Sequence, residues 1–108
     1  MIKVSFQKNG NQLTGFSVKG HSGYAESGSD IVCAAVSSMV MLTVNAICGE
    51  FGAEADVKTD EKDASVSLKL KNDGSQAFGI AVRILNSFRG SVQAVSEEYP
   101  DFVKIIGG

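Results

Sequence analysis

Two reactive side chains lie close together in the sequence, just before a long apolar run. His21 is the only histidine of the 108-residue chain, and Cys33 follows it after a short segment rich in serine and glycine. A cysteine attacks carbonyl groups as its thiolate, and an adjacent imidazole promotes this form by taking the thiol proton. These residue types predict a nucleophilic Cys/His pair that transfers acyl groups.

The intervening residues predict how this pair is positioned. We expect His21 to end a strand and Asp30 to be the N-cap of a helix, so that Cys33 lies in the first helical turn. The macrodipole there favours an anion, and the unpaired N–H groups can hold an oxyanion. We expect a mobile loop over the site that contains Ser22, Gly23, Tyr24, Gly28 and Ser29.

Each of the two residues also has an ordinary structural explanation. A lone cysteine is often a small apolar filler, and a histidine beside glycines is often only a loop residue. A Cys/His pair is recognised by its geometry and not by its order along the chain. Spacing alone therefore leaves the catalytic and the structural roles open.

The motif around the pair resembles a known signature. Residues 20–25 read GHSGYA and residues 28–37 read GSDIVCAAVS, which is similar to the ribosomal-processing cysteine proteases of the Prp family. The resemblance covers the whole chain in length and order of elements. It implies that His21 and Cys33 are the catalytic pair and that Gly20, Asp30 and Ser37 have supporting roles. It also implies a homodimer without a cofactor, whose substrate is the N-terminal extension of a large-subunit ribosomal protein.

A strand hairpin is expected to deliver His21 to the site. Ile2, Val4 and Phe6 alternate with polar residues, and Asn9-Gly10 is a strong turn signal. Residues 13–20 then predict a returning strand in which Leu13 is out of phase with Phe16 and Val18. Gly15 between them indicates a bulge.

The run from residue 31 to residue 49 contains no charged residue. Its length is close to the ~20 residues that cross a bilayer. Four polar residues interrupt it, however, and the rest of the chain has the composition of a soluble protein, so we expect a buried helix and no membrane association. A helix that is apolar all round must be enclosed. One small sheet cannot enclose it, which leaves a second layer of strands or a second subunit, and we favour a homodimer.

The second half of the chain repeats the order of two strands and a helix. Residues 55–58 and 64–71 alternate as a second hairpin, Ser75 can cap an amphipathic helix that Pro100 ends, and residues 102–106 predict a last strand. The prediction is an α+β fold formed by residues 1–108 as a single domain. Its order is β-β-α-β-β-α-β, with two helices packed against antiparallel strands and a central apolar helix.

Composition excludes several classes of function. A net charge of -2, with 20% charged residues, shows no basic patch for direct nucleic-acid binding. The first residues lack the apolar run of a signal peptide, so we expect a cytoplasmic protein with reduced thiols.

Cys33 and Cys48 on one helix would lie roughly 22 Å apart, too far for a disulfide. One histidine and two cysteines at this spacing also predict no metal site, and we interpret Cys48 as a packing residue.

Two other classes of function stay open. The first is a non-catalytic ribosome-assembly binding module, for which a basic surface is expected. The second is another thiol enzyme, such as an amidohydrolase or a redox protein. A redox role usually needs a resolving cysteine nearby, and Cys48 is too distant for that.

Overall fold

The computed structural model describes residues 1–20 and 27–107 and confirms the predicted order of elements. A short π-helical segment, η1, continues the first helix and was not predicted. The elements are β1 (Ile2–Asn9), β2 (Gln12–Lys19), α1 (Ser27–Val44), η1 (Asn45–Glu50), β3 (Ala55–Asp60), β4 (Ser65–Leu70), α2 (Gln76–Glu98) and β5 (Val103–Ile106).

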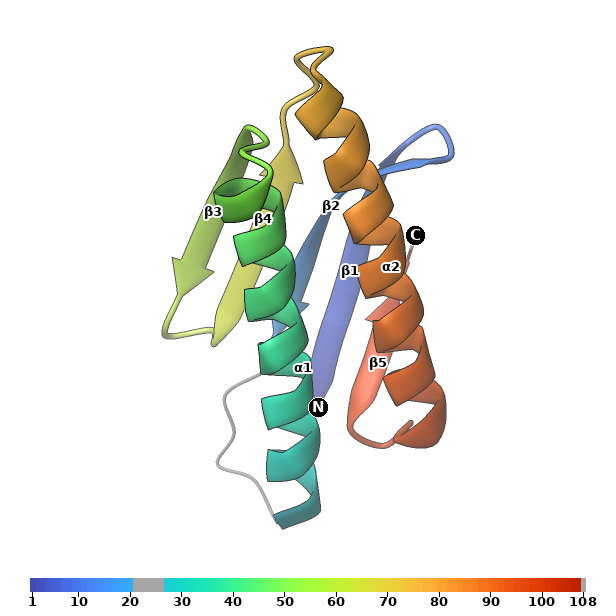
Figure 1. The fold of residues 1–108 in the computed structure, drawn as a ribbon. Helices are drawn as coiled ribbons and strands as arrows, with labels where there is room; N and C mark the ends of the chain where they lie inside the picture. The colour runs from blue at the N-terminus through green and yellow to red at the C-terminus, as the bar shows by residue number, and fades with distance from the viewer. Residues whose placement is uncertain (21–26, 108) are drawn as a thin grey trace.

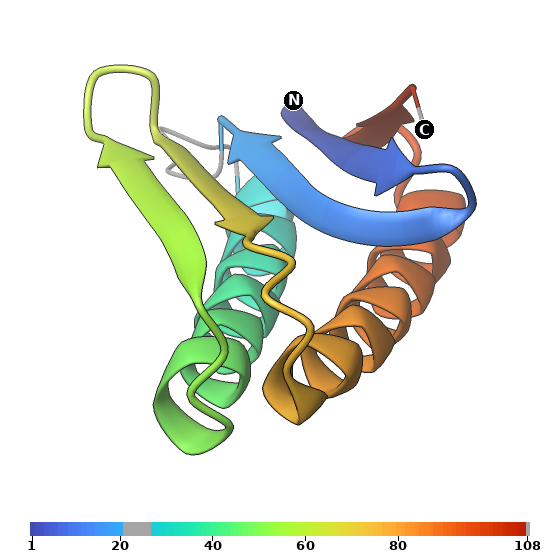
Figure 2. The ribbon, with the colours of Figure 1, turned by 90° about the horizontal axis from the view of Figure 1, so that it is seen from above.

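The strands form one five-stranded sheet in the order β3-β4-β2-β1-β5, and both helices cover the same face of it (Figures 1 and 2). Adjacent strands are antiparallel except for β1 and β5, where Ile2 pairs with Val103 in a parallel register. The expected all-antiparallel arrangement is therefore wrong at this edge. The long helix α2 carries the chain back across the sheet, so that β5 runs in the same direction as β4 and β1.

A bulge lies in β2, one residue before the predicted position. Gln7 pairs with Gly15 and the next residue of β1, Lys8, pairs with Leu13, so Thr14 has no cross-strand partner. The extra residue lets Leu13 and Phe16 both be buried. At Gly15 a Cβ atom would clash with the backbone carbonyl oxygen of Leu68, so this position has no room for a side chain.

The helix α2 packs against the sheet through its predicted apolar stripe. Its N-cap is Ser75, whose side chain accepts a hydrogen bond of 3.1 Å from the backbone N–H of Phe78. The ring of Phe88 lies 4.7 Å from that of Phe16 and 5.9 Å from that of Phe6, measured between centroids. These contacts join α2 to the central strands β1 and β2.

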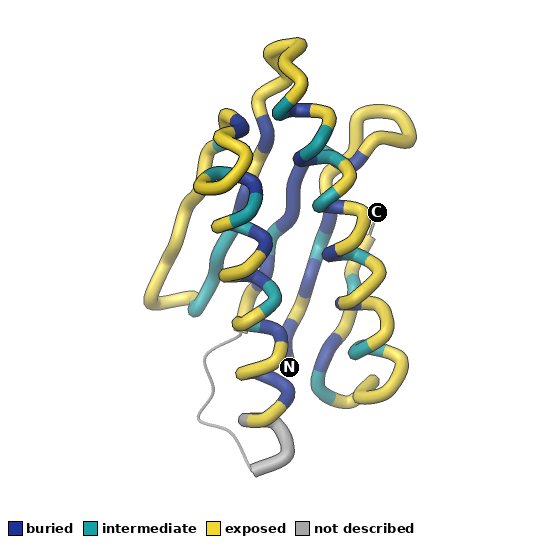
Figure 3. The backbone as a smooth tube through the Cα atoms, in the orientation of Figure 1, coloured by how far each residue is buried: buried dark blue, intermediate teal, exposed yellow. Residues whose placement is uncertain are grey.

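The helix α1 is buried on one side only (Figure 3). Ile31 and Leu42 are each 71% exposed, and Met41 is 65% exposed. The single chain therefore does not enclose this helix. By length and composition alone, Ile31–Glu50 would also suffice to cross a membrane, and 33% of its apolar window is buried within the protein.

The open face of the sheet gathers lysines that are far apart in the sequence. Lys3 on β1 pairs with Lys19 on β2 and with Lys104 on β5, and all three are exposed. The sequence alone does not show this cluster, because the three lysines become neighbours only through the pairing register of the strands. We call Lys104, Lys3 and Lys19 the lysine row.

Candidate active site

Cys33 lies on α1 within the hydrophobic core, with 8% of its surface exposed. His21 and three of the predicted loop residues, Ser22, Gly23 and Tyr24, lie outside the described residues. The position of the thiol is therefore described, whereas the predicted place of the imidazole at the end of a strand lies outside the described residues.

Gly20 holds the backbone immediately ahead of His21. The strand β2 ends at Lys19, one residue before the predicted end at Gly20. The N–H of Gly20 donates to the carbonyl oxygen of Ala64, in the turn between β3 and β4, at 3.1 Å. The φ angle of Gly20 is +79°, and a Cβ atom there would lie 2.7 Å from the carbonyl oxygen of Met1. Only glycine fits this corner.

The first helix begins earlier than the sequence indicated. It starts at Ser27, four residues ahead of Ile31, so Asp30 is not the N-cap, and Gly28 and Ser29 are helical rather than part of a loop. Asp30 is a favourable capping residue directly ahead of the apolar run, which is why it was predicted as the cap. An acidic residue is also favoured inside the first turn, where it meets the positive end of the macrodipole.

The earlier start changes what the helix offers Cys33. Cys33 is the seventh residue of α1 and lies in its second turn. Only the first four N–H groups of a helix lack an intrahelical partner, so the amide of Cys33 is engaged by the helix and is not an oxyanion donor. The prediction that Cys33 lies in the first turn is therefore wrong. The macrodipole was expected to favour the Cys33 thiolate, and it has little effect at this position.

Cys33 shares one side of α1 with Ser37, Val40 and Val44. Ser37 follows it by four residues, and the two valines follow by about two and three turns. Ser37 is half-buried. This side of the helix faces β3 and β4, since Val40 and Val44 line a hollow there together with residues of both strands.

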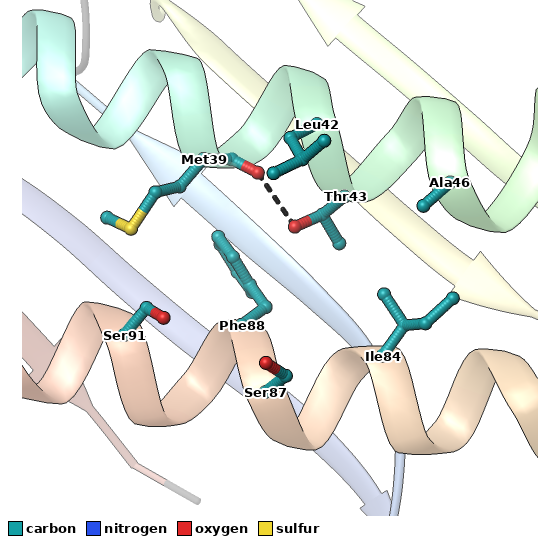
Figure 4. A pocket seen from close by; sticks show the side chains of 8 residues that line it. All are labelled: Met39, Leu42, Thr43, Ala46, Ile84, Ser87, Phe88 and Ser91. Atoms are coloured by element: carbon teal, nitrogen blue, oxygen red, sulfur yellow. Dashed lines mark hydrogen bonds between the residues drawn. The ribbon is translucent and has the colours of Figure 1, made fainter.

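Two hollows flank α1. One of about 310 Å³ lies between α1 and α2, where Met39, Thr43, Ile84 and Phe88 point towards one another (Figure 4). It lies on the other flank of α1 from Cys33 and Ser37. The second, of about 210 Å³, lies between α1, β3 and β4 on the flank of Cys33. Sequence reasoning did not find the second hollow. The alternation of apolar and polar residues predicted a strand with Val57 on its apolar side. Such a pattern cannot show that this side of the strand is left uncovered by the helices.

Cys48 is suited to packing, as predicted. It is half-buried beside the core, and neither it nor Cys33 is in a disulfide. Burial raises the pKa of the Cys48 thiol, and the nearby carboxylate of Glu54 raises it further. Both effects oppose the thiolate, so Cys48 is a poor nucleophile. The described residues contain no group of three His, Cys, Asp or Glu side chains that could hold a metal ion.

Comparisons with known proteins agree on one family. The sequence model of the family described as cysteine protease Prp matches residues 1–104. The ribosomal processing cysteine protease Prp of Staphylococcus aureus is 30% identical, with 97% of each chain covered. The crystal structure of that organism's Prp with a substrate peptide superposes with a TM-score of 0.86 at 26% identity, covering 98% of both chains. A second structure, with a covalently linked product peptide, gives a TM-score of 0.80 at 27% identity, covering 97% of both chains.

These matches span nearly the whole chain. The chain belongs to the cysteine protease Prp family.

Proposed function

We propose that the protein is an endopeptidase that removes the N-terminal extension of a large-subunit ribosomal protein, with Cys33 as nucleophile and His21 as general base. The observation that carries this proposal is the full-length match to a family whose Staphylococcus aureus member is named a ribosomal processing protease. Of the two cysteines, only Cys33 lies in the motif that resembles the family's signature, and the surroundings of Cys48 favour its thiol form.

The proposed reaction has two steps. The sulfur of Cys33 attacks the scissile carbonyl carbon while His21 takes the thiol proton and passes it to the leaving amine. The N-terminal piece of the substrate then remains on Cys33 as a thioester. Water, activated by His21, releases this piece as a free acid. The product peptide linked covalently to the S. aureus relative is consistent with such an intermediate in that protein.

Activation of the thiol depends on His21 in this proposal rather than on the helix end. Cys33 lies beyond the first turn of α1, where the influence of the macrodipole has fallen off. The unpaired N–H groups of α1 belong to residues 27–30, a turn ahead of Cys33. The hydrogen-bond donors that stabilise the oxyanion therefore belong to residues other than Cys33.

Asp30 and Ser37 have supporting roles on either side of the nucleophile. Asp30 precedes Cys33 by three residues and Ser37 follows it by four, so both positions share its side of α1. A carboxylate there opposes the thiolate but stabilises the imidazolium that forms when His21 takes the proton. We assign Asp30 to the orientation of His21, and Ser37 to the position of the thiol.

A homodimer in the cytoplasm completes the proposal. The open side of α1 presents Ile31 and Leu42, which are large apolar side chains exposed to water. A second copy of the chain would cover them. Replacement of Leu42 by aspartate is then expected to shift the mass in solution from dimer to monomer.

The reaction is tested by incubating the protein with the full-length ribosomal protein of its host and measuring intact masses. Wild type and the matched control Cys48→Ala are expected to remove one short N-terminal piece, and Cys33→Ala is expected to leave the substrate intact. If neither wild type nor Cys33→Ala cleaves but both bind the extension, the protein is a binding module instead.

A further inference from the structure

We infer that the groove between α1 and β3 binds an extended segment of the substrate as an added strand on β3, with one apolar side chain of that segment in the hollow. The α1–β3 groove is lined on the helix side by Val40, Met41, Val44 and Asn45 and on the sheet side by Val57, Thr59 and Val66. The inference rests on the proposed protease activity and names the part of the enzyme that selects its substrate.

The strand β3 offers a free edge. It is the outermost strand of the sheet beside α1 (Figure 1) and pairs only with β4 among the described residues. Its six residues, Ala55–Asp60, therefore present unpaired backbone groups along their outer edge. An extended peptide binds such an edge through main-chain hydrogen bonds, and its alternate side chains enter pockets on one face.

The helix-facing side of β3 is apolar yet uncovered. Val57 pairs directly with Leu68 of β4, but Leu68 is fully buried whereas Val57 is 40% exposed. Met41 across the groove is 65% exposed. The hollow between them measures about 210 Å³, which exceeds the roughly 150 Å³ of an apolar cavity that binds benzene. An aromatic or large aliphatic side chain of the substrate fits this space.

The groove lies within reach of the nucleophile. Val40 and Val44 follow Cys33 on the same side of α1 by about 10 to 16 Å along the axis. An extended peptide advances about 3.3 Å per residue. A substrate whose scissile bond lies at Cys33 therefore places the side chain about three to five residues away in the hollow. Ser37 lies between the two sites on the same line.

The test introduces a charge into the groove and asks whether the substrate can compensate for it. Val57→Asp changes a partly exposed residue on an edge strand, and Lys58→Gln, on the opposite face of the same strand, is the matched control. We expect Val57→Asp to lower kcat/KM for the extension peptide by at least about tenfold, mainly through KM, while Lys58→Gln cleaves as wild type does.

Two further readouts separate a subsite from a general defect. A peptide series that carries lysine at each of the positions three to five residues from the scissile bond is expected to restore cleavage by Val57→Asp at one position only. A substrate shortened so that it lacks that position is expected to have a lower kcat/KM with wild type. With Val57→Asp the same shortening is expected to lower kcat/KM little further, so that the two effects are non-additive.

Wild-type cleavage of the unmodified peptide by Val57→Asp, with Cys33→Ala inactive, would overturn the groove and leave the protease activity standing. Full additivity with truncation, or no rescue by any lysine peptide, would also overturn it. A change from dimer to monomer in Val57→Asp would show that a second copy occupies the groove instead. Activity of Cys33→Ala would contradict the proposed function itself.

Discussion

The backbone N–H of Gly20 donates a hydrogen bond of 3.1 Å to the carbonyl oxygen of Ala64, which ties the end of β2 to the turn between β3 and β4. Both residues have positive φ angles, +79° for Gly20 and +49° for Ala64. The bond fixes the backbone directly ahead of His21 against the turn that joins β3, the strand of the α1–β3 groove, to β4. The same hydrogen bond therefore constrains the chain next to the proposed base and the turn next to the proposed substrate groove.

Replacement of Gly20 by alanine is expected to lower both stability and activity. A Cβ atom there would lie 2.7 Å from a backbone oxygen of Met1, and a left-handed φ costs an alanine about 1–2 kcal/mol. Urea unfolding measures the loss, and peptide cleavage measures the effect on the site. The control is Gly90→Ala in α2, where a Cβ atom meets nothing within 4 Å. This control should gain about 1 kcal/mol. An unchanged free energy of unfolding for Gly20→Ala would contradict the described corner.

Replacement of Lys3 by glutamate is expected to stabilise the fold. Lys3 lies between Lys19 and Lys104 in the lysine row, and like charges directly opposite each other on adjacent strands are destabilising. A glutamate would turn two repulsive pairs into attractive ones, a gain of about 0.2–1 kcal/mol for each pair. The gain should appear in urea unfolding at low ionic strength and largely disappear in 1 M salt, where the Debye length is about 3 Å.

The matched control for this charge reversal is Lys8→Glu. Lys8 is also on β1 but pairs with Leu13 and not with a lysine. An equal gain from both variants would show that the stabilisation comes from net charge and not from the lysine row.

The thiol of Cys48 is expected to react slowly with iodoacetamide. Burial and the carboxylate of Glu54 raise its pKa, so at pH 8 less of it is thiolate than in an exposed cysteine, and the rate should keep rising above the ordinary thiol pKa. Glu54→Gln removes the negative charge, lowers the pKa and should speed the reaction at pH 8. Measurement in the Cys33→Ala background isolates this thiol. A slower reaction after Glu54→Gln would reverse the assigned sign.

Replacement of Asp30 distinguishes a cap from a positioning residue. Asparagine caps a helix as well as aspartate does, but α1 begins ahead of residue 30, so capping is not the role of Asp30. We expect both Asp30→Asn and Asp30→Ala to lower kcat while the far-ultraviolet circular dichroism is unchanged, and to shift the acidic limb of the pH profile, where the general base becomes protonated, to lower pH. The shift follows because a carboxylate near His21 favours the imidazolium. Full activity of Asp30→Asn with loss in Asp30→Ala would restore the capping role.

Much of the fold follows from local patterns in the sequence. Period-two alternation predicted β1, β2 and β4, and Ser75 predicted the start of α2, because these signals act within a few residues. The bulge was predicted one residue from its place, since only the pairing of Lys8 with Leu13 identifies the extra residue.

The remaining features depend on residues that are distant in the sequence. The parallel pairing of β5, the lysine row and the exposure of Val57 all arise from register and layer order, which no local pattern encodes. The start of α1 was misjudged for a different reason. Ser27, Gly28 and Ser29 have weak helix propensity, and Asp30 is a favourable capping residue. The predicted start of the helix, at Ile31, was therefore four residues too late.

The central claim is that Cys33 carries the acyl group during cleavage. The most direct measurement mixes excess enzyme with the full-length substrate, quenches in acid within the first turnover, and locates the added mass by peptide mapping. The account predicts an adduct of the N-terminal substrate piece, joined as a hydroxylamine-sensitive thioester, on Cys33 in wild type and in Cys48→Ala. An adduct on Cys48, or cleavage retained by Cys33→Ala, would contradict it.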